Sequence, residues 1–187
     1  CVLAGIYEVM PQRPDLILSG INRGNNAAEN TLYSGTIGAT IEAALQGLPA
    51  IALSQFMGPG NIDISDPFEA AAKTGAALVR MILEKGLWDD KDYRLFYNVN
   101  FPAVPAADVK GHRVVTQGYR KETFMQVQPH SSPSGRKFLW IKGGPQHLPT
   151  GPGTDVTANL DGYTSITPMR CDLTAHDVMN DLRTRLE

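Results

Sequence analysis

The amino-acid sequence predicts an α/β fold built around a doubly wound, parallel β-sheet. Residues 15–19 ("DLILS") form a short, continuous apolar run, which is typical of a strand covered on both faces. Residues 34–47 ("SGTIGATIEAALQG") carry apolar side chains at helical spacing and end at Gly47, a common helix-terminating residue. Residues 50–54 ("AIALS") predict a second buried strand. Because a strand, a helix and a strand in this order almost always form a right-handed crossover between parallel strands, the fold class follows.

The next predicted elements are a long helix and a third strand. Asp66 is expected to cap the helix, with Pro67 at its first position and Glu69 completing a capping box. Residues 93–102 ("YRLFYNVNFP") predict a strand that its final proline closes.

The character of the sequence changes near residue 102, which divides the chain into two predicted parts. Residues 1–102 form the α/β core, and residues 103–187 form a β-rich arm, a returning strand (163–169) and a terminal helix (173–187). Gly, Pro and Ser are so frequent in residues 130–155 that a long hairpin or arm fits better than a second globular domain. Such an arm would expose a run of large apolar side chains and would need a partner, so we expect oligomerisation. The run is Phe138, Leu139, Trp140 and Ile141.

Composition excludes several classes of protein. The formal net charge is -2, from 17 basic and 19 acidic side chains, which gives no general attraction for nucleic acid. No apolar segment approaches the length that crosses a bilayer, so we expect a cytoplasmic protein without a membrane partner. Two cysteines and four scattered histidines argue against a disulfide framework and against a histidine-built metal centre. Residue 1 is a cysteine that follows no methionine, so we expect the natural product to begin upstream.

Polar side chains cluster in the loop that follows the first predicted strand, residues 19–26 ("SGINRGNN"). In open α/β sheets, ligands bind outside the carboxyl ends of the strands, where this loop lies. Asn22 has two interpretations, as a turn residue or as an oxygen ligand for magnesium, manganese or calcium. A neutral amide cannot hold such an ion by itself, so carboxylates would have to come from elsewhere. Asn26 either organises the loop or donates to a ligand through its NH2 group.

A second polar cluster, residues 33–36 ("YSGT"), opens the helix. The first amides of a helix lack intrahelical acceptors and favour negative charge, so Ser34, Gly35 and Thr36 are candidates for binding phosphate. The alternative interpretation is that Ser34 only caps the helix, which serines often do. The sequence leaves the two interpretations equal.

Several motifs together resemble the SurE family, the survival-protein-E phosphatases also called 5'/3'-nucleotidases. The resemblance rests on residues 14–26 ("PDLILSGINRGNN"), 32–54 ("LYSGTIGATIEAALQGLPAIALS") and 98–102 ("NVNFP"), and on "GTD", "GYTSITP" and "DLTAHD" further on. It implies a Rossmann-like core, a swapped C-terminal arm or helix, and homodimers or homotetramers. It also implies a phosphomonoesterase that depends on a divalent metal ion, Mg²⁺ or Mn²⁺, and acts on nucleoside 5'- and 3'-monophosphates.

The resemblance also assigns roles to the two polar clusters. Asn22 matches a metal ligand of the family, and Ser34, Gly35 and Thr36 match the segment beside the phosphate. Asn26 is assigned to the same phosphate or substrate site.

One part of the family pattern does not occur in the sequence. Family members carry an Asn-Asp-Asp-Gly motif after an N-terminal strand, and its aspartates are the principal metal ligands. Asp89 and Asp90 follow a helix end rather than a strand, so the role is not transferred to them. The catalytic residue is therefore unassigned and expected in an N-terminal segment. The alternative hypothesis is a non-catalytic nucleotide- or phosphate-binding oligomer, or an inactive fragment that lacks the aspartates.

Two further residues have competing interpretations. We expect His176 to pair structurally near a subunit interface or the arm rather than to act as a catalytic acid. Asp155 is expected to cap a turn, with an approach to a neighbouring subunit's site as the alternative.

Overall fold

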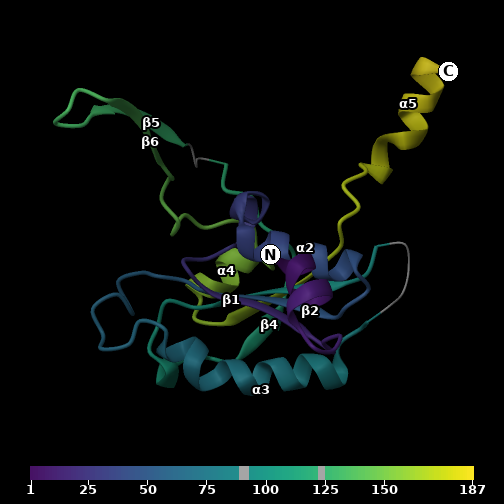
Figure 1. Cartoon of the computed structure of the whole chain (residues 1–187), viewed down its shortest axis with the longest axis horizontal. Coiled ribbons are helices and arrows are strands. Elements are labelled where there is room, and N and C mark those ends of the chain that lie inside the picture. The colour runs from purple at the N-terminus through teal and green to yellow at the C-terminus, as the bar shows by residue number, and fades with distance from the viewer. Residues whose placement is uncertain (89–92, 122–124) are drawn as a thin grey trace.

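The computed structural model places five strands in one central sheet (Figure 1). It describes residues 1–88, 93–121 and 125–187. The spatial order is β1-β2-β3-β7-β4, in which β1, β2 and β3 run parallel, β7 is antiparallel to β3, and β4 is parallel to β7. The bounds are β1 Ile17–Arg23, β2 Ala50–Gln55, β3 Phe96–Phe101, β4 His112–Val114 and β7 Thr164–Met169. The predicted α/β class with a mainly parallel sheet is confirmed.

Helices cover both faces of the sheet, as a doubly wound fold requires. Figure 1 shows α3 (Glu69–Lys85) beneath the sheet and α2 (Gly35–Leu45) and α4 (Asp155–Leu160) on the opposite side. Successive side chains of a strand point to opposite faces, so β2 contributes to both layers. Ala50 and Ala52 pack with α2, while Ile51 and Leu53 pack with α3. Every residue of β2 and β3 is buried, as expected for strands covered on both faces.

Shorter elements complete the chain. They are α1 Val2–Ala4, a π-helical turn Gly5–Val9, 3-10 helices Ala28–Tyr33, Ala106–Asp108 and His176–Val178, strands β5 Gln126–Ser131 and β6 Lys137–Lys142, and α5 Met179–Leu186. Both β4 and β7, which come from beyond residue 102, complete the same sheet as the first three strands. The division of the chain at residue 102 stays a prediction. Among the described residues, no helix has the length and apolar character needed to cross a membrane.

The ends of α2 confirm the sequence signals, and the start of α3 does not. Ser34 is the N-cap of α2, and Gly47 has a φ of 74° just beyond its end. The capping box predicted at Asp66 is wrong, because α3 begins only at Glu69. Asp66 Oδ1 instead accepts the Phe68 N–H at 2.9 Å in the preceding turn. The Glu69 carboxylate accepts the Ala106 N–H at 3.0 Å and pairs with Lys73.

Among the described residues, β1 is the outermost strand of the sheet, and burial of both its faces is not seen. Leu18 is 50% exposed, and β2 is the only strand that pairs with β1 among the described residues. The pairing register shifts between Ser19 and Asn22. Gly20 lies in this shift with a φ of 134°, and a Cβ there would lie 2.2 Å from Leu53 O, so only glycine fits. The Gly20–Ile21 peptide bond is cis. The irregular segment places Asn22 opposite Ser54 at the end of β2.

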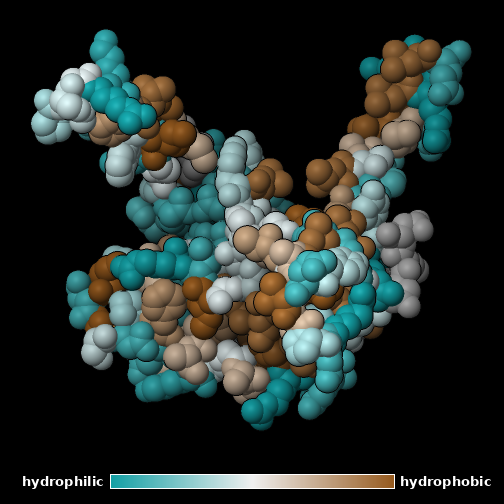
Figure 2. Space-filling model, in the orientation of Figure 1, coloured by the Kyte–Doolittle hydropathy of each residue, from teal (hydrophilic) through white to brown (hydrophobic). Residues whose placement is uncertain are grey.

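The predicted arm is an antiparallel hairpin of β5 and β6 that projects away from the sheet (Figure 1). All residues of both strands are exposed, including Phe138, Leu139, Trp140 and Ile141. Figure 2 shows apolar side chains gathered on the hairpin and on the projecting α5. Oligomerisation through these two segments stays a prediction.

The C-terminal segment is organised by Asp172, and α5 begins only at Met179, later than the predicted helix at 173–187. Asp172 Oδ1 accepts the Thr174 N–H at 2.9 Å, and Oδ2 lies 2.6 Å from His176 Nε2. Hydrogen bonds from Thr174 and His176 lower the pKa of Asp172 to about 2. His176 thus forms a structural pair, as expected, and its place at a subunit interface stays a prediction.

Candidate functional site

Asn22 lies at the carboxyl end of β1 and uses one half of its amide to shape the loop. Its Nδ2 donates to Gly24 O at 2.9 Å, a local turn contact. This bond turns the side-chain oxygen, which is the hard donor that a divalent cation prefers, away from the turn. The side chain is half-buried. The turn interpretation and the ligand interpretation therefore use different atoms and are compatible.

Asn26 fixes the loop to the neighbouring strands. Its Nδ2 donates to Ser54 Oγ at 2.7 Å, and its backbone N–H donates to Asn100 Oδ1 at 2.7 Å. Its carbonyl oxygen accepts from Asn98 Nδ2 at 2.8 Å. These contacts are those of a loop-organising residue. The donation of its NH2 group to a ligand stays a prediction.

Sequence reasoning missed the polar side chains that hold Asn26. Ser54, Asn98 and Asn100 are fully buried in β2 and β3 and face the side of the sheet that α2 covers. Their signal was present, because asparagines two apart in a buried strand point to the same face.

The start of α2 offers free donors next to this network. Ser34 Oγ accepts the Ile37 N–H at 3.1 Å, which is the capping contact. A hydroxyl that accepts one hydrogen bond still carries a hydrogen to donate, so capping leaves Ser34 able to reach a phosphate oxygen. Gly35 is exposed, and a Cβ there would meet no atom within 4 Å. Gly35 therefore leaves the first turn of α2 open to approach.

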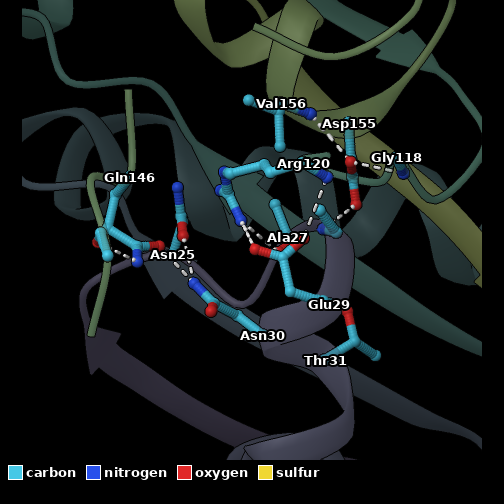
Figure 3. Close-up of polar contacts among 12 residues, drawn as sticks. Asn25, Ala27, Glu29, Asn30, Thr31, Gly118, Arg120, Gln146, Asp155 and Val156 are labelled. Carbon is cyan, nitrogen blue, oxygen red and sulfur yellow. Dashed lines mark hydrogen bonds and ion pairs between the residues drawn. The ribbon is translucent and has the colours of Figure 1, made fainter. Parts of the chain in front are cut away.

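A buried arginine holds the other end of the loop (Figure 3). Arg120 is 2% exposed, and its Nη1 donates to Glu29 Oε1 at 2.8 Å and to Ala27 O at 3.3 Å. The Arg120 backbone N–H donates to Glu29 Oε2 at 3.1 Å. Glu29 thus accepts from both the side chain and the backbone of one residue.

A buried aspartate lies beside this pair. Asp155 is fully buried, and its Oδ2 accepts the Ala28 N–H at 2.9 Å (Figure 3). Its Oδ1 accepts from Gly118 N–H at 2.9 Å and Val156 N–H at 2.8 Å. Burial raises the pKa of Asp155 although these N–H groups and Arg120 oppose the shift. Asp155 was expected to cap a turn, but its carboxylate mainly joins segments that are distant in the sequence. An approach to a neighbouring subunit stays a prediction.

We call this group the loop clamp, defined as Ala27, Ala28, Glu29, Gly118, Arg120 and Asp155. It joins the loop after β1 to the segment that leads into the arm. The arm also contacts the loop where it returns, because Asn30 Nδ2 donates to Gln146 Oε1. Both ends of the arm therefore contact the loop that carries Asn22 and Asn26.

The contribution of ionised Glu29 to the free energy of unfolding is expected to depend on pH. Burial raises its pKa, but hydrogen bonds from its own backbone and from Arg120 outweigh burial and lower the pKa below 4.5. A carboxyl group of lowered pKa stabilises the fold above its unfolded pKa, and this contribution is lost as the pH falls through the folded pKa. In urea unfolding, the free-energy difference between wild type and Glu29→Gln should therefore shrink as the pH falls below 4.5. A difference that is constant with pH would contradict this.

The fit of a divalent cation to these residues is partial. Asn22 supplies one neutral oxygen of a suitable kind. The part of the chain that the structure describes holds no group of three or more His, Cys, Asp or Glu side chains that could bind a metal. Asp89 and Asp90 lie outside the described residues. The charge of a cation at Asn22 would have to be balanced by carboxylates from outside the described residues.

A mainly parallel sheet with helices on both faces, and with Asn22 and Asn26 at the carboxyl end of its first strand, defines a Rossmann-like α/β protein. The family model described as "Survival protein SurE" matches residues 1–123. The chain belongs to the SurE family.

Curated relatives and a solved structure agree with this family. The chain is 67% identical to "5'-nucleotidase SurE" of Cereibacter sphaeroides, in a match that covers 97% of this chain and 70% of the relative. It is 61% identical to the protein of the same name from Ruegeria pomeroyi, over 100% of this chain and 72% of the relative. The crystal structure of SurE protein from Aquifex aeolicus superposes with a TM-score of 0.75 at 35% identity, covering 100% of this chain and 72% of that chain.

Proposed function

We propose that this protein is a nucleotidase that hydrolyses nucleoside 5'- and 3'-monophosphates to nucleoside and phosphate with a divalent cation, Mg²⁺ or Mn²⁺. The observation that carries the proposal is the placement of the Asn22 amide beside strands whose polar residues hold the loop, with the open start of α2 nearby. The names of the curated relatives, 5'-nucleotidase SurE, support the nucleotidase activity.

The residues of this chain would act mainly by binding and orienting the phosphate. Ser34 and Thr36 would donate hydroxyl hydrogens to phosphate oxygens, and Gly35 lets the phosphate approach the helix amides. The positive end of α2 would stabilise the charge that develops on these oxygens during transfer. A cation with Asn22 as one ligand supplies Lewis acidity toward the phosphoryl group. Asn26 and the loop clamp keep Asn22 in register with these donors.

The first experiment measures phosphate release from AMP by the full-length protein with manganese and then with excess EDTA. Turnover that stops with EDTA and returns on addition of metal supports the enzyme. Nucleotide binding without turnover would support the alternative, a non-catalytic nucleotide-binding oligomer on the same fold.

A test of the phosphate subsite is Thr36→Val, which removes a hydroxyl and keeps the shape. Hydrogen bonds to charged groups contribute about 1.5–3 kcal/mol, so KM for AMP should rise by roughly tenfold or more. Thr36 is not the helix cap, so stability should change little, whereas Ser34→Ala should also cost about 1 kcal/mol as a lost cap. The matched control is Thr74→Val on α3, whose hydroxyl bonds within its own helix at 2.6 Å. Equal KM in wild type, Thr36→Val and Thr74→Val would remove Thr36 from the phosphate site.

A further inference from the structure

A pocket of about 360 Å³ lies beyond the carboxyl ends of β2 and β3, beside the end of α4. Its volume is in the range of small-molecule sites. Its lining is largely apolar with three polar side chains, and it holds no lysine, arginine, aspartate or glutamate. The lining residues are Phe56, Met57, Gly58, Pro59, Ala103, Val104, Gln146, His147, Asn159 and Leu160.

Hydrogen bonds join three walls of this pocket to the loop that carries Asn22 and Asn26. The Gly24 N–H donates to Gln55 O at 2.9 Å, directly before Phe56. Gln146 accepts from Asn30, as described above. Asn159 Nδ2 donates to Asn100 O at 2.8 Å, and the Asn100 side chain accepts the Asn26 N–H. The walls of the pocket and the proposed phosphate site are therefore held by the same loop.

Asn159 contributes a buried acceptor without a partner. Its NH2 group donates to Asn100 O at 2.8 Å and to Tyr163 O at 3.0 Å. Because carbonyl oxygens only accept, these bonds fix the orientation of the amide. Asn159 is 2% exposed, and its Oδ1 has no hydrogen-bond partner among the described residues. A buried acceptor left unpaired is costly, so a donor from a bound molecule would stabilise it.

We propose that this pocket receives the nucleoside portion of the substrate and that Asn159 Oδ1 accepts a hydrogen bond from it. The inference rests on the proposed nucleotidase function. A lining without acidic or basic side chains other than His147 suits a neutral group and would leave a second phosphate uncompensated. The apolar walls at Phe56, Met57 and Leu160 suit the faces of a base. A nucleoside offers two kinds of donor to Asn159, an exocyclic amine of the base and a ribose hydroxyl.

The pocket is tested by filling it with Val104→Trp in the full-length protein. Val104 is half-buried in the pocket wall, and the matched control is Val9→Trp, at a residue that is 76% exposed outside the pocket. Val104→Trp should raise KM for AMP at least about tenfold, while kcat/KM for p-nitrophenyl phosphate, which has no nucleoside, stays within about twofold of wild type. An unchanged KM for AMP, or an equal loss with both substrates, would overturn the proposal.

A second readout does not depend on turnover. Adenosine, which has no phosphate, should bind wild type at millimolar concentration in ligand-observed NMR and should not bind Val104→Trp. Lack of binding to wild type would overturn the nucleoside pocket. If adenosine binds but neither AMP nor p-nitrophenyl phosphate is hydrolysed with metal present, the pocket stands and the proposed activity fails.

The role of Asn159 is tested with substrate analogues, because changing Asn159 itself would break its bonds to Asn100 and Tyr163. The analogues are purine riboside monophosphate, which lacks the exocyclic amine, and 2'-deoxy-AMP and 3'-deoxy-AMP, which each lack one hydroxyl. A site built around a buried polar group rejects a ligand that lacks its partner, so one analogue should show at least about a tenfold higher KM than AMP. That analogue identifies the donor. Equal KM values for all four nucleotides would overturn the contact with Asn159.

Discussion

Replacing Arg120 with methionine is expected to lower the free energy of unfolding by about 3 kcal/mol, the low end of the cost of breaking a buried ion pair. The Arg120 side chain has no exposed surface, and that of Glu29 is 18% exposed. Methionine fills much of the same space but leaves the Glu29 carboxylate without its cationic partner, and Ala27 O keeps only the Asn30 N–H as a donor. Urea unfolding measures the change, at a pH where Glu29 is ionised.

The matched control is Arg113→Met in β4. Arg113 pairs with Asp161 at 3.3 Å with both side chains about half exposed, and it also lies 3.6 Å from the Tyr163 ring centroid. Exposed pairs and ring contacts of this kind contribute about 1 kcal/mol or less. The double variant Arg120→Met/Glu29→Leu should regain part of the loss, because it removes the uncompensated charge. Equal losses of unfolding free energy in Arg120→Met and Arg113→Met would show that the buried Arg120–Glu29 pair stabilises the fold no more than an exposed pair does.

The position of the loop clamp suggests that Arg120 affects catalysis as well as stability. Arg120 precedes β5 in the sequence, and Gln146 follows β6. Both residues bond to the loop that bears Asn22 and Asn26. A displacement of the arm would therefore act on the loop at two points. We expect Arg120→Met to lower kcat/KM for AMP as well as stability, because catalysis depends on holding reacting groups in register.

Local sequence signals predicted helix ends and strands well where the interactions that determine them lie within a few residues. The apolar run of β2, the Ser34 cap and the Gly47 terminus all act within a few residues, and the structure confirms them. Burial of β1 on both faces depends on neighbours that are distant in the sequence, and the described residues leave Leu18 half exposed. The capping box at Asp66 was wrong because the Glu69 carboxylate bonds to Ala106, which is 37 residues away.

The loop clamp could not be predicted because its contacts join residues that are far apart in the sequence. Arg120 and Glu29 are 91 residues apart, and Asp155 and Ala28 are 127 residues apart. Tertiary folding alone brings these groups together. The sequence could still point to Asn22 and Ser34, because turn chemistry and helix capping are local.

Replacing Asn22 in the full-length protein is expected to have the largest effect on activity. Asn22→Ala should lower metal-stimulated kcat/KM for AMP by about 100-fold, the upper end of the loss seen when groups around a metal are changed. The physical reason is the loss of one oxygen ligand at a cation whose other ligands are outside the described residues. Phosphate release is measured over a series of manganese concentrations.

Asn22→Asp separates the ligand role from the turn role. Aspartate keeps an oxygen at the position and adds negative charge, but it loses the N–H donor that now bonds to Gly24 O at 2.9 Å. If Asn22 serves the cation, Asn22→Asp should retain much of the manganese response that Asn22→Ala loses, since carboxylates bind hard divalent ions well. If Asn22 serves only the turn, both variants lose the same bond and should show the same activity. Wild-type turnover by Asn22→Ala at saturating manganese would place the cation elsewhere, and the loop would then contribute shape to the site but no metal ligand.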